Sequence, residues 1–242
     1  MIAVALGLAP AALAHPQASP DTNNRYLKLT PMGDRVRVAY TIFLGEKPGA
    51  ALRRRLDRDR NGEIDDAEAA PYGEEIAALV KLAVSVTIDG RPTSIAWTTV
   101  DVGLGTPSVV GGAFSVDLDG GLCTSGPSHR LVLRDTVRLD RPGESEVKIE
   151  DGPGVLIGAR TLGGQAMDKL DQLWTGADGP LTEGLDLSWT VDDAAARPAD
   201  GRCHDARPKG SRWPWAKATL ALIALAAIAM VAWKARQRKV NG

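Results

Sequence analysis

The ten residues from Arg35 to Leu44 read RVRVAYTIFL, and they indicate the fold class. Large apolar side chains recur at every second position of this segment: Val36, Val38, Tyr40, Ile42 and Leu44. A side-chain period of two is typical of a strand that turns one face toward a hydrophobic core. The segment therefore predicts a half-buried β-strand.

Several other segments have the composition of short strands, and Gly- and Pro-rich turns separate them. Tyr26–Thr30 precedes the first strand across a Pro-Met-Gly-Asp turn, which predicts a hairpin. The other predicted strands are Leu82–Ile88, Ser94–Val100, Phe114–Leu118, Arg130–Val137, Ser145–Ile149, Val155–Ala159 and Leu185–Val191. Many short strands favour a sandwich or a barrel. We expect one mainly β, sandwich-like domain over residues 15–191.

Two segments interrupt the β pattern. One is a helix-loop-helix insert over residues 48–82. The other is Gly164–Trp174, in which Met167, Leu170, Leu173 and Trp174 would share one helical face. This second segment predicts an amphipathic helix that packs on the core.

The insert contains an acidic stretch, Asp57-Arg-Asp59-Arg-Asn61-Gly62-Glu63-Ile64-Asp65-Asp66-Ala67-Glu68. Oxygen-bearing side chains occupy alternate positions, glycine is sixth and glutamate is twelfth. Calcium prefers six to eight hard oxygen ligands, and a loop around one ion presents alternate residues inward. The stretch resembles the calcium loop of EF-hand proteins at every defined position. A solvated acidic turn is the alternative interpretation.

The resemblance implies a role for each loop residue. Asp57, Asp59 and Asn61 would supply side-chain oxygens, and Glu63 would supply its backbone carbonyl. Asp65 would act through a water, and Glu68 would bind with both carboxylate oxygens. Gly62 would permit the sharp turn, and Ile64 would fix the loop to a core. The implied cofactor is Ca²⁺.

The helices around this loop differ from the usual EF-hand pattern. Leu52 and Leu56 suit the inner face of the first helix, but Pro71 and Gly73 follow Glu68 within two turns. Since proline removes a helix hydrogen bond, we expect a short or kinked second helix. The sequence contains no second matching loop, so this one must pack against the β domain.

Both ends of the chain have the composition of membrane-targeting segments. Residues 1–14 are apolar and end in Ala12-Leu13-Ala14, which predicts a signal peptide cleaved before His15. Ala218–Trp233 carries no charge, and Trp213 and Trp215 stand at its border, so residues 213–233 predict a transmembrane helix. The basic tail, 234–242, would be cytoplasmic and the N-terminal part extracytoplasmic, periplasmic or external. Residues 192–212 would form a linker.

The charge is divided along the chain. All 30 acidic residues lie between His15 and Arg212, and five of the 29 basic residues follow Arg212. The exported part is therefore acidic, with a net charge of about −6. An acidic domain without a basic stripe excludes a nucleic-acid partner. The predicted partners are the membrane, through one helix, and another membrane or envelope protein.

Cys123 and Cys203 are the only two cysteines, and both lie in the predicted exported part. A cysteine pair in an oxidising compartment predicts a disulfide. A metal site that includes His204 and His129 is the alternative. The α-amino group and imidazole of His15 could also chelate copper, although a disordered tail is the simpler interpretation.

A second resemblance rests on His15-Pro16, Asn24-Arg25-Tyr26, the Arg35–Val38 strand and the acidic loop. These features are similar to the exported segment before the membrane part of bacterial nickel/cobalt transporter-like proteins. Those transporters continue into several membrane spans, whereas one is predicted here.

The sequence contains neither G-x-S-x-G nor H-E-x-x-H, and it has only three histidines. Asp117, Asp119, Asp135 and Asp140 could include a catalytic carboxylate pair, but acids at turns are usually solvated. Asp117-Leu-Asp119-Gly could be a poorer calcium site or a plain turn. We expect a non-enzymatic interaction module with structural calcium. An accessory subunit of a metal or solute transporter is the alternative.

Overall fold

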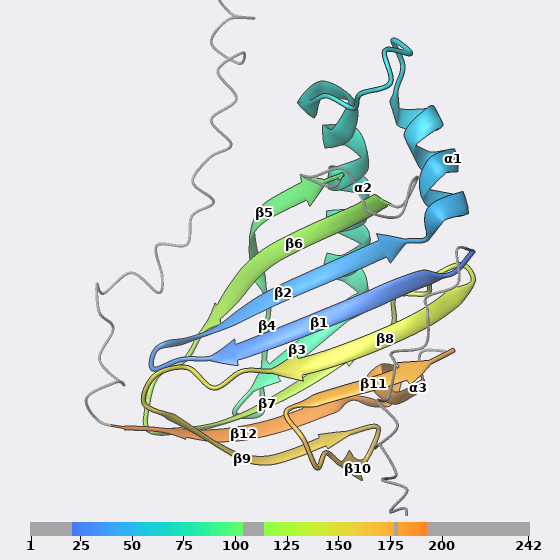
Figure 1. Ribbon diagram of the computed structural model, residues 1–242. Coiled ribbons are helices and arrows are strands. Elements are labelled where there is room, and N and C mark those ends of the chain that lie inside the picture. The colour runs from blue at the N-terminus through green and yellow to red at the C-terminus, as the bar shows by residue number, and fades with distance from the viewer. Residues whose placement is uncertain (1–20, 104–113, 177–178, 193–242) are drawn as a thin grey trace, which may run out of the picture. The chain divides into compact units, whose positions relative to one another are not determined.

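The computed structural model describes residues 21–103, 114–176 and 179–192. These residues form two six-stranded sheets, shown in Figure 1. The first sheet contains, in spatial order, β11 (Asp171–Thr175), β8 (Pro142–Ile149), β1 (Asn23–Pro31), β2 (Arg35–Leu44), β6 (Phe114–Cys123) and β5 (Ala96–Val102). The second contains β10 (Gln165–Ala166), β9 (Val155–Leu162), β12 (Leu185–Val191), β7 (Ser128–Asp135), β3 (Val84–Ile88) and β4 (Arg91–Thr93).

The strands are antiparallel except for β1 and β8, which run parallel at the centre of the first sheet. The predicted hairpin is β1–β2, in which Leu27 pairs with Tyr40 and Leu29 with Val38. Alternate residues of the strands in both sheets enter one hydrophobic core. The mainly β, sandwich-like prediction is therefore confirmed.

The helix-loop-helix segment connects the two sheets. Helix α1 (Glu46–Leu56) follows β2 of the first sheet, and α2 (Asp66–Ala83) leads into β3 of the second. In Figure 1, α1 and α2 lie beside each other at the end of β2, with their connecting loop beyond them. α1 contacts β6 and β2, and α2 contacts β5, β3 and β6. A short helix, α3 (Gly179–Glu183), precedes β12.

The second helix was predicted to be short or kinked, and the first of these alternatives was wrong, because α2 is 18 residues long and continues past Pro71. Pro71 is exposed, so the carbonyl that loses its hydrogen bond can face water. Burial of Ile76 and Val80 holds the following turns on the β domain. Gly73 permits the close approach, since a Cβ there would lie 2.9 Å from a Val102 methyl.

The helix predicted over Gly164–Trp174 was also wrong. This segment contains β10 and β11, which pair with β9 of the second sheet and β8 of the first. Gly163 and Gly164 have φ values of 57° and 73°, which make a tight turn and do not begin a right-handed helix. The helical spacing of Met167, Leu170, Leu173 and Trp174 is therefore coincidental, although Met167, Leu170 and Trp174 pack on the core.

Most other strands lie where they were predicted, with shifted ends. β3 begins at Val84, because Leu82 still belongs to α2 and its side chain is 88% exposed. β6 continues through Asp117, Asp119 and Gly120 to Cys123, so the predicted plain turn at Asp117–Gly120 was wrong.

Several predicted features lie outside the described residues. They are the signal peptide (1–14), His15, the segment 193–212 with Cys203 and His204, the transmembrane helix (213–233) and the basic tail (234–242). Among the helices of the described ranges, none has both the length and the apolarity to cross a membrane.

Candidate metal centre

The two helix ends fix the position of the acidic loop. Asp57 directly follows α1, and its backbone N–H donates to the carbonyl of Arg53 at 2.9 Å. Asp65 is the N-cap of α2, and Glu68 is the third residue of that helix. Their side chains form a capping box, in which Asp65 Oδ1 accepts from the Glu68 N–H at 2.9 Å. The helix start thus orients the last residue of the predicted loop.

Short-range hydrogen bonds wrap the residues between the helices. Gly62, with φ of 88°, donates its N–H to Asp57 Oδ2 at 3.0 Å. The Asn61 N–H donates to Asp59 Oδ1 at 3.0 Å, and the Glu63 N–H donates to Asn61 Oδ1 at 2.7 Å. Asp and Asn favour such side-chain bonds to the backbone two residues further on.

Three predicted ligands come together in this loop. One carboxylate oxygen from each of Asp57, Asp59 and Glu68 lies within 4.8 Å of the other two. Two oxygens bound to one calcium, each at roughly 2.3–2.6 Å, can be separated by no more than about 5 Å. The spacing and the all-oxygen donor set therefore fit a hard cation such as calcium.

The hydrogen bonds of these carboxylates are unequal. Glu68 is 7% exposed, and its Oε1 accepts from the Arg58 N–H at 2.6 Å. In contrast, Asp57 Oδ1 is buried and has no hydrogen-bond partner among the described residues. A buried carboxylate oxygen without a partner is costly, since it has lost its contact with water. A cation bound between Asp57 and Glu68 would remove that cost.

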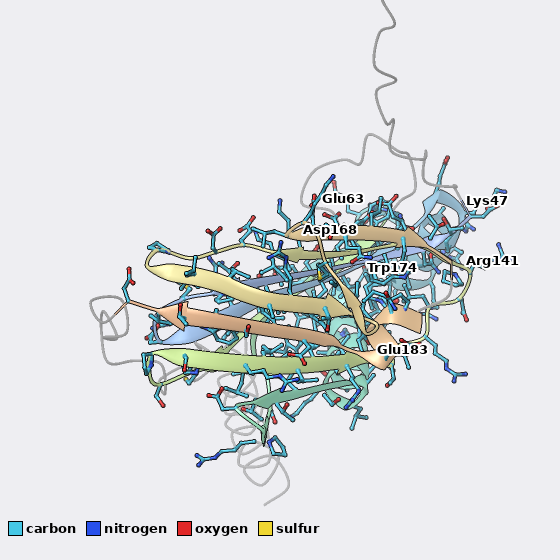
Figure 2. The ribbon with its side chains drawn as sticks, turned by 90° about the horizontal axis from the view of Figure 1, so that it is seen from below. Lys47, Glu63, Arg141, Asp168, Trp174 and Glu183 are labelled. Atoms are coloured by element: carbon cyan, nitrogen blue, oxygen red, sulfur yellow. The ribbon has the colours of Figure 1, made fainter. Side chains whose placement is uncertain are left out.

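The other predicted ligands are not part of the three-carboxylate group. The amide of Asn61 donates to Asp59 Oδ2 at 2.9 Å, and its Oδ1 accepts from Glu63. Asp65 caps α2, and Glu63 is exposed and labelled in Figure 2. An amide oxygen has a second lone pair, so the Asn61 bond leaves room for a cation.

Charge and packing around the loop have opposite effects. The loop contains six acidic residues and only two basic ones, Arg58 and Arg60, to balance their charge. The acids are Asp57, Asp59, Glu63, Asp65, Asp66 and Glu68. Their mutual repulsion disfavours the closed loop in the absence of a cation. Leu52 and Leu56 are buried, and Ile64 packs on the core, as the sequence predicted.

The other candidate residues are bound within the fold. The nitrogens of His129, which is buried, lie 3.0 Å from Asp89 Oδ2 and from the Gly126 carbonyl oxygen, so neither is free for a metal. Asp117 accepts hydrogen bonds from Thr41 and Ser115 within the first sheet.

Cys123 is exposed at the end of β6 and is not a free thiol. Because Cys203 lies outside the described residues, the disulfide between them stays a prediction.

Two features were missed by sequence reasoning. Arg25 and Asp135 form a fully buried ion pair between the sheets, 110 positions apart in the chain. A pocket also lies between α1, α2 and the segment before β8. Neither has a local sequence signal, since strand pairing and chain crossovers bring these residues together.

In comparisons with known proteins, no family model matches the chain, and no curated protein sequence matches it. The EF-hand resemblance therefore rests on the loop residues and on their geometry.

Proposed function

We propose that the protein is a membrane-anchored, extracytoplasmic domain that binds calcium at the loop between α1 and α2. The observation that supports this most directly is the Asp57, Asp59 and Glu68 group, in which Asp57 Oδ1 is buried without a partner. The apolar segment 213–233 and the basic residues after it support the membrane anchor.

Calcium in this proposal is structural. The loop joins α1, which contacts strands of the first sheet, to α2, which contacts strands of both sheets. Its acidic side chains repel one another without a cation. An ion that binds only the folded loop stabilises the fold by mass action, by about 2.7 kcal/mol at a concentration of 100 times Kd. Extracellular modules typically bind calcium at roughly 10⁻⁴–10⁻³ M. Saturation well below micromolar calcium would contradict this structural, low-affinity role.

The domain would act as an interaction module. Leu79 and Leu82 stand three positions apart on α2 and are 44% and 88% exposed. Side chains three apart share one face of a helix, and exposed large apolar residues that lie together favour protein contacts. This face of α2 supports a partner in the membrane or envelope.

The test is thermal unfolding of the full-length protein in calcium and in chelator. Calcium should raise the melting temperature, and Glu68→Gln should lose this rise because one ligand oxygen is replaced by an amide nitrogen. Glu63→Gln is the matched control, since its predicted ligand is the backbone carbonyl, and it should keep the rise. Absence of a calcium-dependent shift in the wild type, together with no binding in a titration, would refute the calcium site.

A further inference from the structure

We propose that the pocket between α1, α2 and the segment before β8 binds a small monocarboxylate with an apolar chain. The pocket has a volume of about 550 Å³, which is within the usual range for small-molecule sites. It is separate from the calcium loop, and the proposal does not depend on calcium.

The pocket has an apolar side formed by the end of β2 and the first turns of α1. Leu44, Pro48, Ala51 and Leu52 line it there. Leu52 belongs to the hydrophobic core, so this wall is continuous with the interior of the domain. An apolar chain of a few carbons would be removed from water against these residues, which favours its binding.

Cationic side chains also line the pocket. Lys47 and Arg55 come from α1, and Arg141 comes from the segment before β8. Figure 2 shows the labelled Lys47 and Arg141 side chains at the same end of the molecule. Among the described residues, neither the Arg55 nor the Arg141 guanidinium has a carboxylate partner. Guanidinium groups bind carboxylates through paired, charge-assisted hydrogen bonds.

The polar side of the pocket is fixed by its surroundings. The carbonyl of Arg141, a residue with φ of 49°, accepts from the Asn23 N–H at 3.0 Å. The buried Asn23 side chain donates to the Asp140 carbonyl at 2.7 Å. On α1, the Arg55 guanidinium lies 5.5 Å from the centre of the Tyr72 ring. Binding would therefore require little new ordering of the backbone.

The charges of the lining residues and of Asp21, the ion-pair partner of Lys47, favour a ligand with one negative charge. Lys47 forms an ion pair with Asp21 at 2.8 Å, and Asp140 lines the pocket beside the three cations. Asp21 neutralises Lys47 from outside the lining, so the three cations and two acids together leave one net positive charge. This charge matches one carboxylate better than a phosphate ester of charge about −1.5 to −2. Burial raises the pKa of the Tyr72 phenol, while the Arg55 charge opposes part of that effect, so this hydroxyl remains a neutral donor.

The first test is calorimetric titration of the full-length protein in calcium with hexanoate, hexanol and inorganic phosphate. Hexanoate should bind saturably and more tightly than the other two, because only hexanoate has both the charge and the apolar chain. The proposal is overturned if hexanoate shows no saturable binding. It is also overturned if hexanol or phosphate binds as tightly as hexanoate.

The second test locates the site. Replacing both Arg55→Gln and Arg141→Gln should weaken hexanoate binding by about tenfold or more. The matched control is the double replacement of Arg54→Gln and Arg138→Gln, two exposed arginines outside the pocket lining, which should keep the wild-type affinity. An equal loss in both variants would place the carboxylate elsewhere and overturn the proposal. The selectivity of the wild type decides the question even if a variant fails to fold.

Discussion

Two carboxylates of this protein, the buried Asp135 and the half-buried Asp57, differ in how they are neutralised. Asp135 on β7 is fully buried, and its Oδ2 accepts from Arg25 at 2.6 Å and from the Tyr40 hydroxyl at 2.8 Å. Its Oδ1 accepts from the Val137 N–H at 2.8 Å. Asp57 at the end of α1 has one oxygen bonded to the Gly62 N–H and a second, buried oxygen without a partner among the described residues.

Asp135 is neutralised by a cation that belongs to the chain, the Arg25 side chain, whereas Asp57 would be neutralised by a bound metal ion. Between the sheets, the chain supplies its own positive charge, because Arg25 on β1 faces Asp135 on the opposite sheet. At the loop, oxygens of Asp57, Asp59 and Glu68 lie within 4.8 Å of one another, and no basic side chain of the described residues forms an ion pair with them. A buried charge left without compensation costs several kcal/mol. We therefore expect the first site to depend on its arginine and the second on a bound ion.

The largest expected effect follows removal of the internal cation. Arg25→Met should lower the free energy of unfolding by roughly 3–5 kcal/mol, because it leaves Asp135 charged and buried without its partner. Denaturant unfolding followed by tryptophan fluorescence measures the change. The loss should be the same in calcium and in chelator.

A double replacement controls for the shape of the side chains. Arg25→Met combined with Asp135→Leu removes both charges, and it should recover much of the stability lost in the single variant. If Arg25→Met alone loses less than about 1 kcal/mol, the ion pair does not anchor the two sheets, and the contrast with Asp57 disappears.

The next effect should depend on the external cation. In chelator, Asp57→Asn should be at least as stable as the wild type, since it removes one of the mutually repelling acids. In calcium at 100 times the wild-type Kd, the variant should lose up to about 2.7 kcal/mol relative to the wild type. Asp135→Asn should destabilise the protein in both conditions. A loss for Asp57→Asn that is equal with and without calcium would show that the loop does not use an ion.

The features that could be predicted from sequence are local ones. The alternation over Arg35–Leu44 predicted β2, because a strand with one buried face has a side-chain period of two. The acidic loop was recognisable because its ligands, its turn glycine and its helix cap all lie within twelve residues. Ile64, Leu52 and Leu56 were assigned to the core for the same reason.

The features that were missed depend on contacts distant in sequence. The Asp135 that neutralises Arg25 is brought opposite it by the packing of two sheets. The apolar residues of Gly164–Trp174 have helical spacing, but the strands of this segment, β10 and β11, pair with different sheets. The partner strands, β9 and β8, lie outside the segment, so its own sequence does not show this pairing. Pro71 suggested a short or kinked helix, whereas the close packing of Gly73 on β5 and the burial of Ile76 and Val80 hold α2 on the domain beyond it. Tertiary contacts overrode local propensity in both segments.

The smallest expected effect tests whether the backbone conformation at Gly62 contributes to the calcium affinity of the loop. Gly62 has φ of 88° and Gly164 has φ of 73°, and a Cβ would meet no atom within 4 Å at either position. Both Gly→Ala replacements should therefore cost about 1 kcal/mol in chelator, from backbone strain alone. Only Gly62 donates its N–H to Asp57 Oδ2, so only Gly62→Ala should also weaken calcium binding. Calorimetric titration of the two variants measures this difference. Equal calcium affinities would mean that the Asp57 carboxylate is oriented without the Gly62 hydrogen bond, and the loop would then hold its ligands through the α2 capping box.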